Sequence, residues 1–277
     1  MSVLAKPVFS IVTPNYNGAR FLRQALESVL NQYYTALEYV VVDGASTDGK
    51  GFALTSGEIM GWINSDDVLH PGCLSQVARV FEARPEVEWI AGRPSTMNVS
   101  GEIEHVGPVR PWSRLRFLAG DHFWIQQEST FWRRSLWERA GGGLDTDFEV
   151  ANDFDLWARF FRHADLYTVD RMLGCFRVRP GQRSVECITL YKREVRTILQ
   201  RELSGTEREA LDSHLRVLDP PVIRMGAVRL HAATGQSGGA RFGTGLRVPE
   251  PVSDLSALKD RHKGERCFIL GNGPSLN

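Results

Sequence analysis

Residues 57–67 read Gly57-Glu58-Ile59-Met60-Gly61-Trp62-Ile63-Asn64-Ser65-Asp66-Asp67 and place two adjacent carboxylates directly after a short apolar run. The run is bounded by Gly57 and Pro71, which is typical of a buried strand. In an open α/β sheet, ligands bind beyond the carboxyl ends of the strands. Oxygen ligands at that position suit Mg²⁺ or Mn²⁺, ions that often accompany a diphosphate. Taken alone, Ser65-Asp66-Asp67 also fits a solvated turn, because aspartate is common in turns.

The bulk composition is that of an ordinary globular protein. The chain has 277 residues, a length that suits one large or two modest domains. Of these residues, 42% are hydrophobic. Lys+Arg 33 balance Asp+Glu 33, so the net charge gives no sign of a nucleic-acid or anionic membrane partner. No apolar run approaches the length of a membrane span, and residues 1–7 lack the pattern of a signal peptide. The scattered cysteines favour reduced thiols in a cytoplasmic protein over a disulfide framework or zinc site; they are Cys73, Cys175, Cys187 and Cys267.

Strands and amphipathic helices alternate along the first half of the chain. Residues 8–13 form a β-branched strand, residues 21–30 repeat apolar side chains at helical spacing, and residues 37–42 form a second strand. This order, with short connections, predicts a right-handed parallel βαβ unit. The further expected elements, in chain order, are a helix-like piece at 51–56, a strand at 59–64, a helix at 74–81, a strand at 87–91, helices at 135–140 and 152–163, strands at 166–169 and 172–178, helices at 186–203 and 206–218, a linker at 234–251 and a strand at 266–270.

Four places carry candidate chemistry, and each has a structural alternative. Tyr16 follows the first strand and offers a ring on which a base could pack, although the same segment fits a simple helix start. Asp43 ends the second strand, where it could accept from a nucleoside or assist a helix cap. The third place is the pair of aspartates quoted above. The fourth place is Asp153, near the start of an apolar helix. It could act as a general base, or it could be there because the helix dipole stabilises a carboxylate at that end. Trp157 lies on the same helical face and could line the pocket.

These segments, in this order, resemble the motifs of family 2 glycosyltransferases. Residues 9–17 and 38–49 are similar to the opening motifs of that family, and residues 57–67 are similar to its metal-binding Asp-x-Asp strand. Residues 126–134 and 152–157 resemble its acceptor-side motifs. The resemblance covers roughly residues 8–184. It implies an α/β structure with the GT-A fold, a mixed nucleotide-binding sheet flanked by helices, here with a helical C-terminal extension.

The resemblance also implies a role for each matching residue. Asp67 would bind Mn²⁺ or Mg²⁺, and Asp153 would be the catalytic base of an inverting transfer. Asp153 matches the second position of a Glu-Asp pair, whose first position is Asn152 here. The residues implied to hold the donor nucleotide are Thr13, Pro14, Tyr16, Asp43 and Asp66. The residues implied to line the acceptor side are Gln127, Glu128 and Trp157.

The implied reaction moves a sugar from a nucleotide-diphosphate donor to a hydroxyl group of a glycan or lipid-linked glycan in surface polysaccharide assembly. The implied location is cytoplasmic, either free or peripheral at the inner membrane, with no transmembrane segment and no nucleic-acid partner. Two other functions stay open. One is a catalytically impaired relative that only binds its ligand. The other is a nucleotidyltransferase, although residues 13–20 lack the glycine-rich basic loop that such an enzyme would need.

Two departures from the family pattern bear on activity. Gly49 runs directly into Lys50, where relatives carry one more helix and strand, on the order of 30 residues. We expect strand 37–42 to be left as an exposed edge and donor binding to suffer more than folding. The second departure is Arg179, which stands where many relatives carry a histidine. The candidate phosphate contacts, with solvated strand-end arginines as the alternative, are Arg177, Arg179 and Arg183.

The end of the chain suggests a further unit. Residues 267–277 resemble the first strand and glycine loop of a sialyltransferase-like nucleotide-binding domain. The predicted organisation is a GT-A domain at 1–203 that lacks about one βα unit near 49–50. A helical extension and linker at 204–250 follow, and then the start of a truncated second domain at 251–277.

Overall fold

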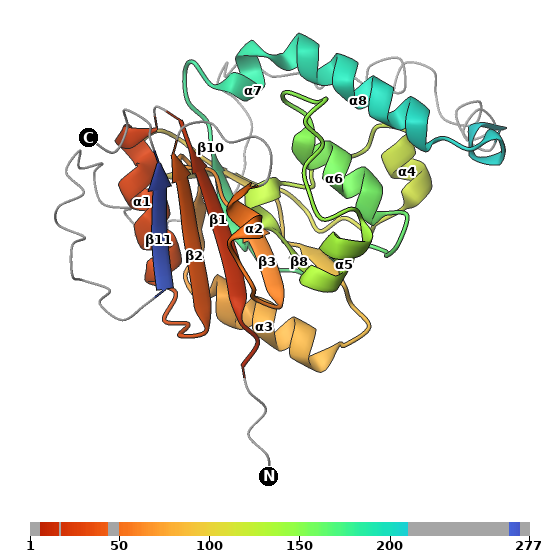
Figure 1. The fold of residues 1–277 in the computed structure, drawn as a ribbon. Helices are drawn as coiled ribbons and strands as arrows, with labels where there is room; N and C mark the ends of the chain where they lie inside the picture. Colours follow the sequence, from red (N-terminus) through yellow and green to blue (C-terminus); the bar gives the residue numbers. More distant parts are fainter. Residues whose placement is uncertain (1–5, 17, 44–49, 210–265, 272–277) are drawn as a thin grey trace.

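A mixed seven-stranded sheet forms the centre of the fold, with helices on both faces (Figure 1). The computed structural model describes residues 6–16, 18–43, 50–209 and 266–271. The sheet has the order β11-β2-β1-β3-β8-β5-β9. Its strands are β1 (Phe9–Asn15), β2 (Leu37–Asp43), β3 (Ile59–Trp62), β5 (Trp89–Ala91), β8 (Thr130–Arg133), β9 (Tyr167–Thr168) and β11 (Arg266–Gly271).

A second sheet and the helices complete the architecture. The second sheet has four strands in the order β4-β10-β6-β7. They are β4 (Val68–Leu69), β10 (Gly174–Arg177), β6 (Ser95–Met97) and β7 (Ile103–Val106). The helices are α1 (Ala19–Leu30), α2 (Lys50–Ala53), α3 (Cys73–Ala83), α4 (Arg114–Leu118), the 3-10 helix η1 (Gln127–Ser129), α5 (Arg134–Arg139), α6 (Asn152–Phe160), α7 (Arg183–Glu186) and α8 (Ile188–Glu202). No helix in the described residues is long and apolar enough to cross a membrane.

The N-terminal βαβ unit forms as the sequence predicts. β1 pairs in parallel with β2 on one side and with β3 on the other. Residues 9–13 of β1 are all buried, as expected for a central strand that is covered on both faces. The carboxyl ends of β1, β2 and β3 therefore meet at one edge of the sheet. That edge receives the segment after β1 and the Asp66–Asp67 turn after β3.

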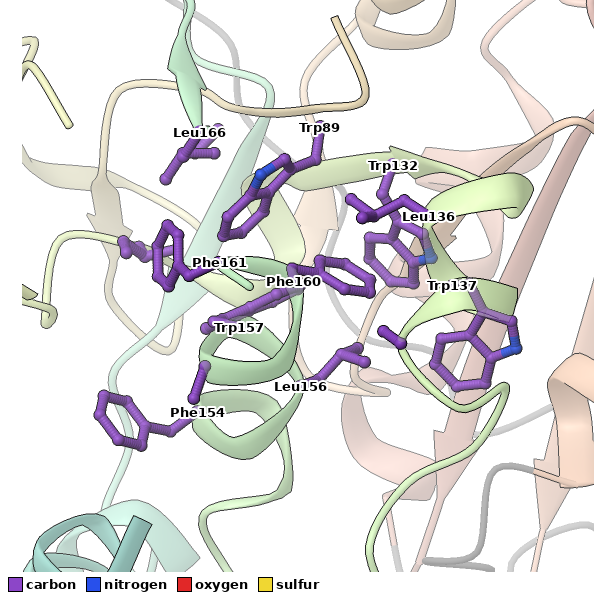
Figure 2. Close-up of a cluster of buried hydrophobic side chains, with 14 of the residues drawn as sticks. Trp89, Trp132, Leu136, Trp137, Phe154, Leu156, Trp157, Phe160, Phe161 and Leu166 are labelled. Carbon is purple, nitrogen blue, oxygen red and sulfur yellow. The ribbon is translucent and has the colours of Figure 1, made fainter. Parts of the chain in front are cut away.

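The sheet separates two apolar clusters. On one face, α1 and α3 contribute Leu22, Leu26, Leu74 and Val77 to a cluster with the side chains of β1 and β2. On the other face, α4, α5, α6 and α8 close over a cluster rich in tryptophan and phenylalanine (Figure 2). Burial of these large rings is the main driving force for folding of this half of the chain.

The strand β8 makes the sheet mixed, because it lies antiparallel between β3 and β5. The sequence analysis predicted no strand there, since the short run Thr130–Arg133 follows directly on polar residues. The pairing of β8 with β3 has a consequence for the site. The helix η1, just before β8, contacts β3, β4 and β10 and so lies beside the Asp66–Asp67 turn.

The strand β11 lies beside β2 at the edge of the sheet (Figure 1). The two strands are parallel, with Arg266 opposite Glu38 and Gly271 opposite Asp43. The expectation that strand 37–42 is left as an exposed edge is therefore wrong, because the outer backbone groups of β2 are paired. The predicted linker at 234–251 and most of the predicted helix at 206–218 lie outside the described residues. The division into domains stays a prediction.

Candidate active site

The two carboxylates of the Asp66–Asp67 turn have different surroundings. Asp67 is fully buried, and it accepts hydrogen bonds from the backbone N–H of Arg177 at 2.8 Å and from the Asn64 amide at 3.2 Å. Burial, together with the negative charge of Asp66, raises the pKa of Asp67. Asp66 is half-buried, and it pairs with Nε of Arg179 at 2.7 Å. A cation close to Asp67 would therefore be stabilised, since it would compensate a buried charge.

Arg177 stabilises the Asp66–Asp67 turn from the interior of the protein. Its side chain is 0% exposed, and its guanidinium lies 4.5 Å from the centre of the Phe21 ring. The guanidinium donates to the Asp66 carbonyl at 2.7 Å, the Asn98 carbonyl at 3.0 Å and the Gln24 side chain at 2.7 Å. The predicted contact of Arg177 with phosphate stays a prediction, but it does not fit these bonds, because the donors of the guanidinium are used within the protein.

The other two arginines keep contact with solvent. Arg179 is half-buried, and its ion pair with Asp66 places it beside the turn. Arg183 is more exposed and pairs with Glu149 at 2.8 Å. Both fit the predicted role of phosphate contacts, which stays a prediction.

Glu128 connects the two halves of the site. It lies in η1 and is only 2% exposed, and one of its carboxylate oxygens makes no hydrogen bond within the described residues. Burial raises the pKa of Glu128 well above its usual range, and the charges of Asp67, Asp153 and Asp66 raise it further. Asp67 and Asp153 therefore both lie close enough to Glu128 for their charges to act on its carboxyl group. Gln127, next to it, is buried and donates to the Trp62 carbonyl.

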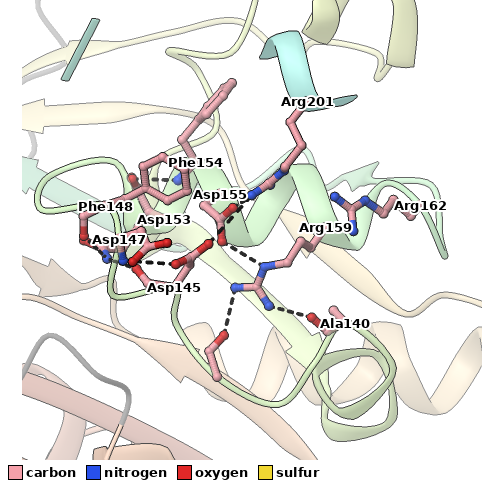
Figure 3. Close-up of polar contacts among 12 residues, drawn as sticks. Ala140, Asp145, Asp147, Phe148, Asp153, Phe154, Asp155, Arg159, Arg162 and Arg201 are labelled. Carbon is pink, nitrogen blue, oxygen red and sulfur yellow. Dashed lines mark hydrogen bonds and ion pairs between the residues drawn. The ribbon is translucent and has the colours of Figure 1, made fainter. Parts of the chain in front are cut away.

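Asp153 lies in the first turn of α6 and is half-buried. Burial raises the pKa of Asp153 to about 6, although a hydrogen bond from the N–H of Phe154, at 2.7 Å, lowers it. Asp155, two residues later, is fully buried between Arg159 at 2.8 Å and Arg201 at 2.6 Å (Figure 3). The difference decides their chemistry. Asp155 forms ion pairs with Arg159 and Arg201, whereas Asp153 can exchange a proton near neutral pH.

Glu194 of α8 fixes the segment that leads into α6. Its carboxylate accepts from the N–H groups of Glu149 at 2.8 Å, Val150 at 3.0 Å and Ala151 at 2.9 Å. The sequence analysis did not identify this residue. Its partners are backbone groups more than forty positions earlier in the chain, so no local pattern signals the contact.

Trp157 belongs to the core and not to the acceptor side. It is 2% exposed and stacks on Trp89 with ring centroids 5.6 Å apart, and it meets Trp132 edge-on, also at 5.6 Å (Figure 2). The prediction that Trp157 lines the pocket is therefore wrong. Helical spacing places it on the same side of α6 as Asp153, but one turn further along the helix that side is covered by β5 and β8.

The predicted donor residues lie at the ends of β1 and β2. The hydroxyl of Thr13 is buried at 2.9 Å from the hydroxyl of Tyr39, so the Thr13 side chain faces the interior and does not fit the predicted contact with a base. Tyr16 is 65% exposed just beyond β1, and Pro14 is half-buried. Asp43 closes β2 opposite Asn15, at the same edge of the sheet, and its side chain lies outside the described part of the structure.

The described residues contain no group of three or more His, Cys, Asp or Glu side chains arranged to hold a metal ion. A divalent cation nevertheless fits the oxygen-donor chemistry at Asp67. Mg²⁺ at nucleotide sites is usually bound by one or two carboxylates and completed by substrate phosphates and water. A ready-made cage of protein ligands is therefore not expected.

Comparisons with known proteins point to one family. The sequence profile described as "Glycosyl transferase family 2" matches residues 10–50, so the match ends at the short Gly49–Lys50 junction. An uncharacterized glycosyltransferase of Rickettsia prowazekii is 24% identical over 209 residues, which cover 64% of this chain and 65% of that one. One of Rickettsia felis is 32% identical over 246 residues, 73% of this chain and 40% of the relative. The O-antigen biosynthesis protein RfbC of Myxococcus xanthus is 26% identical over 190 residues, 56% of this chain and 14% of the relative. The chain thus spans less than two thirds of these relatives.

Solved structures show the same fold. S. aureus TarS 1-349 in complex with UDP-GlcNAc has a TM-score of 0.57 at 17% identity, over 74% of this chain and 70% of that one. The S. aureus TarS structure has a TM-score of 0.55 at 16% identity, over 76% of this chain and 43% of that one. The predicted GT-A type fold is confirmed by this likeness. The chain is therefore similar to family 2 glycosyltransferases over part of its length, and it shares the fold of TarS.

Proposed function

We propose that this protein is an inverting, metal-assisted glycosyltransferase that moves a sugar from a nucleoside diphosphate to a hydroxyl group of a glycan acceptor. The observation that carries the proposal is the shared surroundings of Glu128. The charges of Asp67, after β3, and of Asp153, on α6, both raise the pKa of Glu128, although the two aspartates come from distant parts of the chain. A donor held on one side and a proton acceptor on the other is the arrangement that such a transfer needs.

The donor would bind along the carboxyl edge of β1, β2 and β3. The exposed ring of Tyr16 is free to pack on the base. Asp66 and Arg179 form an ion pair at this edge, and a diphosphate could compete with Asp66 for the guanidinium of Arg179. Asp67 would hold a divalent cation, which when bound supplies positive charge for the leaving diphosphate.

Asp153 would take the proton of the acceptor hydroxyl while that oxygen attacks the anomeric carbon. A pKa of about 6 leaves most of the group ionised at neutral pH yet keeps it basic enough to accept a proton. Attack from the side opposite the leaving diphosphate inverts the anomeric configuration. TarS was solved with UDP-GlcNAc and with UDP, and this supports a nucleotide-sugar donor here as well.

One of the relatives supports a biological role. RfbC of Myxococcus xanthus is named as an O-antigen biosynthesis protein, so we place this chain in surface polysaccharide assembly. The acceptor would be a glycan or a lipid-linked glycan. The transfer would take place in the cytoplasm, at or near the inner membrane.

The test separates donor binding from chemistry. UDP binding is measured by calorimetry with and without Mn²⁺, and transfer from UDP-GlcNAc to a panel of alkyl glycosides is followed by mass spectrometry. We expect Asp67→Ala to lose the Mn²⁺-dependent part of UDP binding and Asp153→Asn to keep UDP binding without transfer. Asp147→Asn, in the exposed loop before α6, is the matched control and should behave like the wild type. Unchanged transfer by Asp153→Asn would refute the assignment of the base.

A catalytically impaired binding protein is the second candidate. The family match ends at residue 50, where the chain joins Gly49 directly to Lys50. In that case UDP would bind with Mn²⁺, but no donor in a panel of nucleotide sugars would be consumed by the wild type.

A further inference from the structure

An aromatic wall stands beside Asp153. It consists of His122 and Phe123 from the loop after α4, Phe154 from α6 and Tyr191 from α8. The His122 ring stacks on Phe123 at 4.5 Å and lies 4.5 Å from Phe154, while Phe123 and Tyr191 are 6.2 Å apart. Three separate elements thus converge on one apolar surface.

The outer member of this wall is open to solvent. Phe123 is 46% exposed and is the one phenylalanine of the described residues that ranks as exposed. His122 and Phe154 are buried behind it, and Tyr191 is half-buried. Exposing half of a phenylalanine ring costs free energy in the unliganded protein. His122 stacks against the Phe123 ring, so the ring is packed on one side while it stays partly exposed.

The wall borders the proposed base. Asp153 immediately precedes Phe154, and the charge of Asp153 adds to the burial that raises the pKa of Tyr191. Burial lowers the pKa of His122 to about 4, against a weaker opposing effect of the Gly120 backbone, so this ring is neutral at physiological pH. Neither ring nitrogen of His122 makes a hydrogen bond of regular geometry within the described residues. The surface therefore combines a neutral apolar face with one carboxylate.

We propose that the aromatic wall is the acceptor subsite and that it binds a pyranose ring by one of its C–H faces against Phe123. Such a face carries slight positive charge, which an aromatic face attracts, and its apolar area is removed from water on contact. A hydroxyl group on the rim of the same ring can then donate to Asp153. A phosphate group is disfavoured there, because the wall borders the carboxylate of Asp153 and its four residues carry no positive charge.

This inference rests on the proposed function, since it makes Asp153 the group that the acceptor hydroxyl must reach. In the reaction the hydroxyl proton passes to Asp153, the oxygen forms the new glycosidic bond, and the bond from the anomeric carbon to the diphosphate breaks. The wall would select acceptors by their sugar ring, whereas the carboxyl edge of β1, β2 and β3 would bind the nucleotide of the donor.

The experiment is saturation-transfer NMR on the full chain with UDP, Mn²⁺ and a panel of methyl glycosides. For a glycoside that binds, we expect the protons of one ring face to receive saturation. We expect Phe123→Ala to weaken its binding about tenfold, an effect of the size seen when a buried aromatic contact is truncated. Phe123→Tyr should retain binding. Tyr167→Ala is the matched control, because Tyr167 is also an exposed aromatic residue, 42% exposed, on β9 at the far edge of the sheet.

The two proposals fail in different ways. If wild-type protein does not bind UDP, the proposed function is wrong. If UDP binds but no glycoside of the panel does, or if Phe123→Ala binds the glycoside as well as the wild type, the acceptor subsite is wrong. UDP binding by Phe123→Ala within about twofold of the wild type shows that the variant is folded, so that a loss of glycoside binding is local.

Discussion

Replacing Arg177 by methionine separates a structural arginine from a functional one. Methionine keeps most of the side-chain length and the packing on Phe21, but it removes four hydrogen bonds donated by a buried cation, at 2.7, 3.0, 3.4 and 2.7 Å. Each hydrogen bond to a charged group contributes ~1.5–3 kcal/mol, and the contributions do not add fully. Removing one member of a buried polar network costs ~3–5 kcal/mol, so we expect Arg177→Met to lower the free energy of unfolding by about 4 kcal/mol.

The matched variant is Arg179→Met, two residues later. Its ion pair with Asp66 is partly exposed, with side-chain exposures of 31% and 15%. Such pairs contribute only ~0–1 kcal/mol, so stability should hardly change while the affinity for UDP falls. Urea unfolding followed by tryptophan fluorescence gives the first quantity, and calorimetry with UDP and Mn²⁺ gives the second. For Arg177→Met, the expected loss of ~4 kcal/mol corresponds, in a protein of this size, to a melting temperature lower by about 10 °C.

One result would refute this reasoning. If Arg177→Met unfolds within ~1 kcal/mol of the wild type yet no longer binds UDP, the guanidinium contacts the ligand, and its internal hydrogen bonds give way when the donor arrives.

Three further perturbations test other parts of the structure. Because burial raises the pKa of Asp153 to about 6, the rate of transfer should fall about tenfold per unit below pH 6 and level off above it, in a pH–rate profile measured at saturating donor; a flat wild-type profile would exclude Asp153 as the base. Trp157→Ala should lower the free energy of unfolding by ~3–5 kcal/mol in urea titrations without a selective rise in the acceptor KM, since the ring fills the core; a selective KM effect would restore it to the acceptor side. Deletion of residues 266–271 should uncover the outer edge of β2 and cause self-association in light scattering, whereas a monomeric deletion variant would show that β11 is dispensable for solubility.

Local patterns predicted the elements that carry their own signal. The strand at 8–13 and the helix at 21–30 correspond to β1 and α1, because alternating or helically spaced apolar residues leave few other ways to bury them. The Asp66–Asp67 turn also followed from sequence, since an apolar run that ends in carboxylates fixes where those carboxylates emerge from the sheet. β8 was missed, because four residues between two polar segments carry too little periodicity.

Contacts between distant segments could not be predicted. Arg177 and Arg179 are two positions apart and chemically identical, yet only Arg177 meets Gln24 and the Asn98 carbonyl, which come from α1 and from the loop between β6 and β7. Trp157 shares a helical face with Asp153, but what covers each turn of α6 is decided by the rest of the fold. The region around Glu128 depends on β8 pairing with β3, and this also has no local signature.

The pairing of β11 with β2 has a consequence for the order of folding. Arg266 finds its partner at Glu38, a loop closure of about 230 residues, which is among the slowest kinds of contact to form. During synthesis on the ribosome, the first βαβ unit can therefore assemble long before the strand that completes its outer side has been translated. In that interval the main chain of β2 offers unpaired amides and carbonyls to any neighbouring nascent polypeptide, so chaperones that shield such surfaces should raise the yield of native protein.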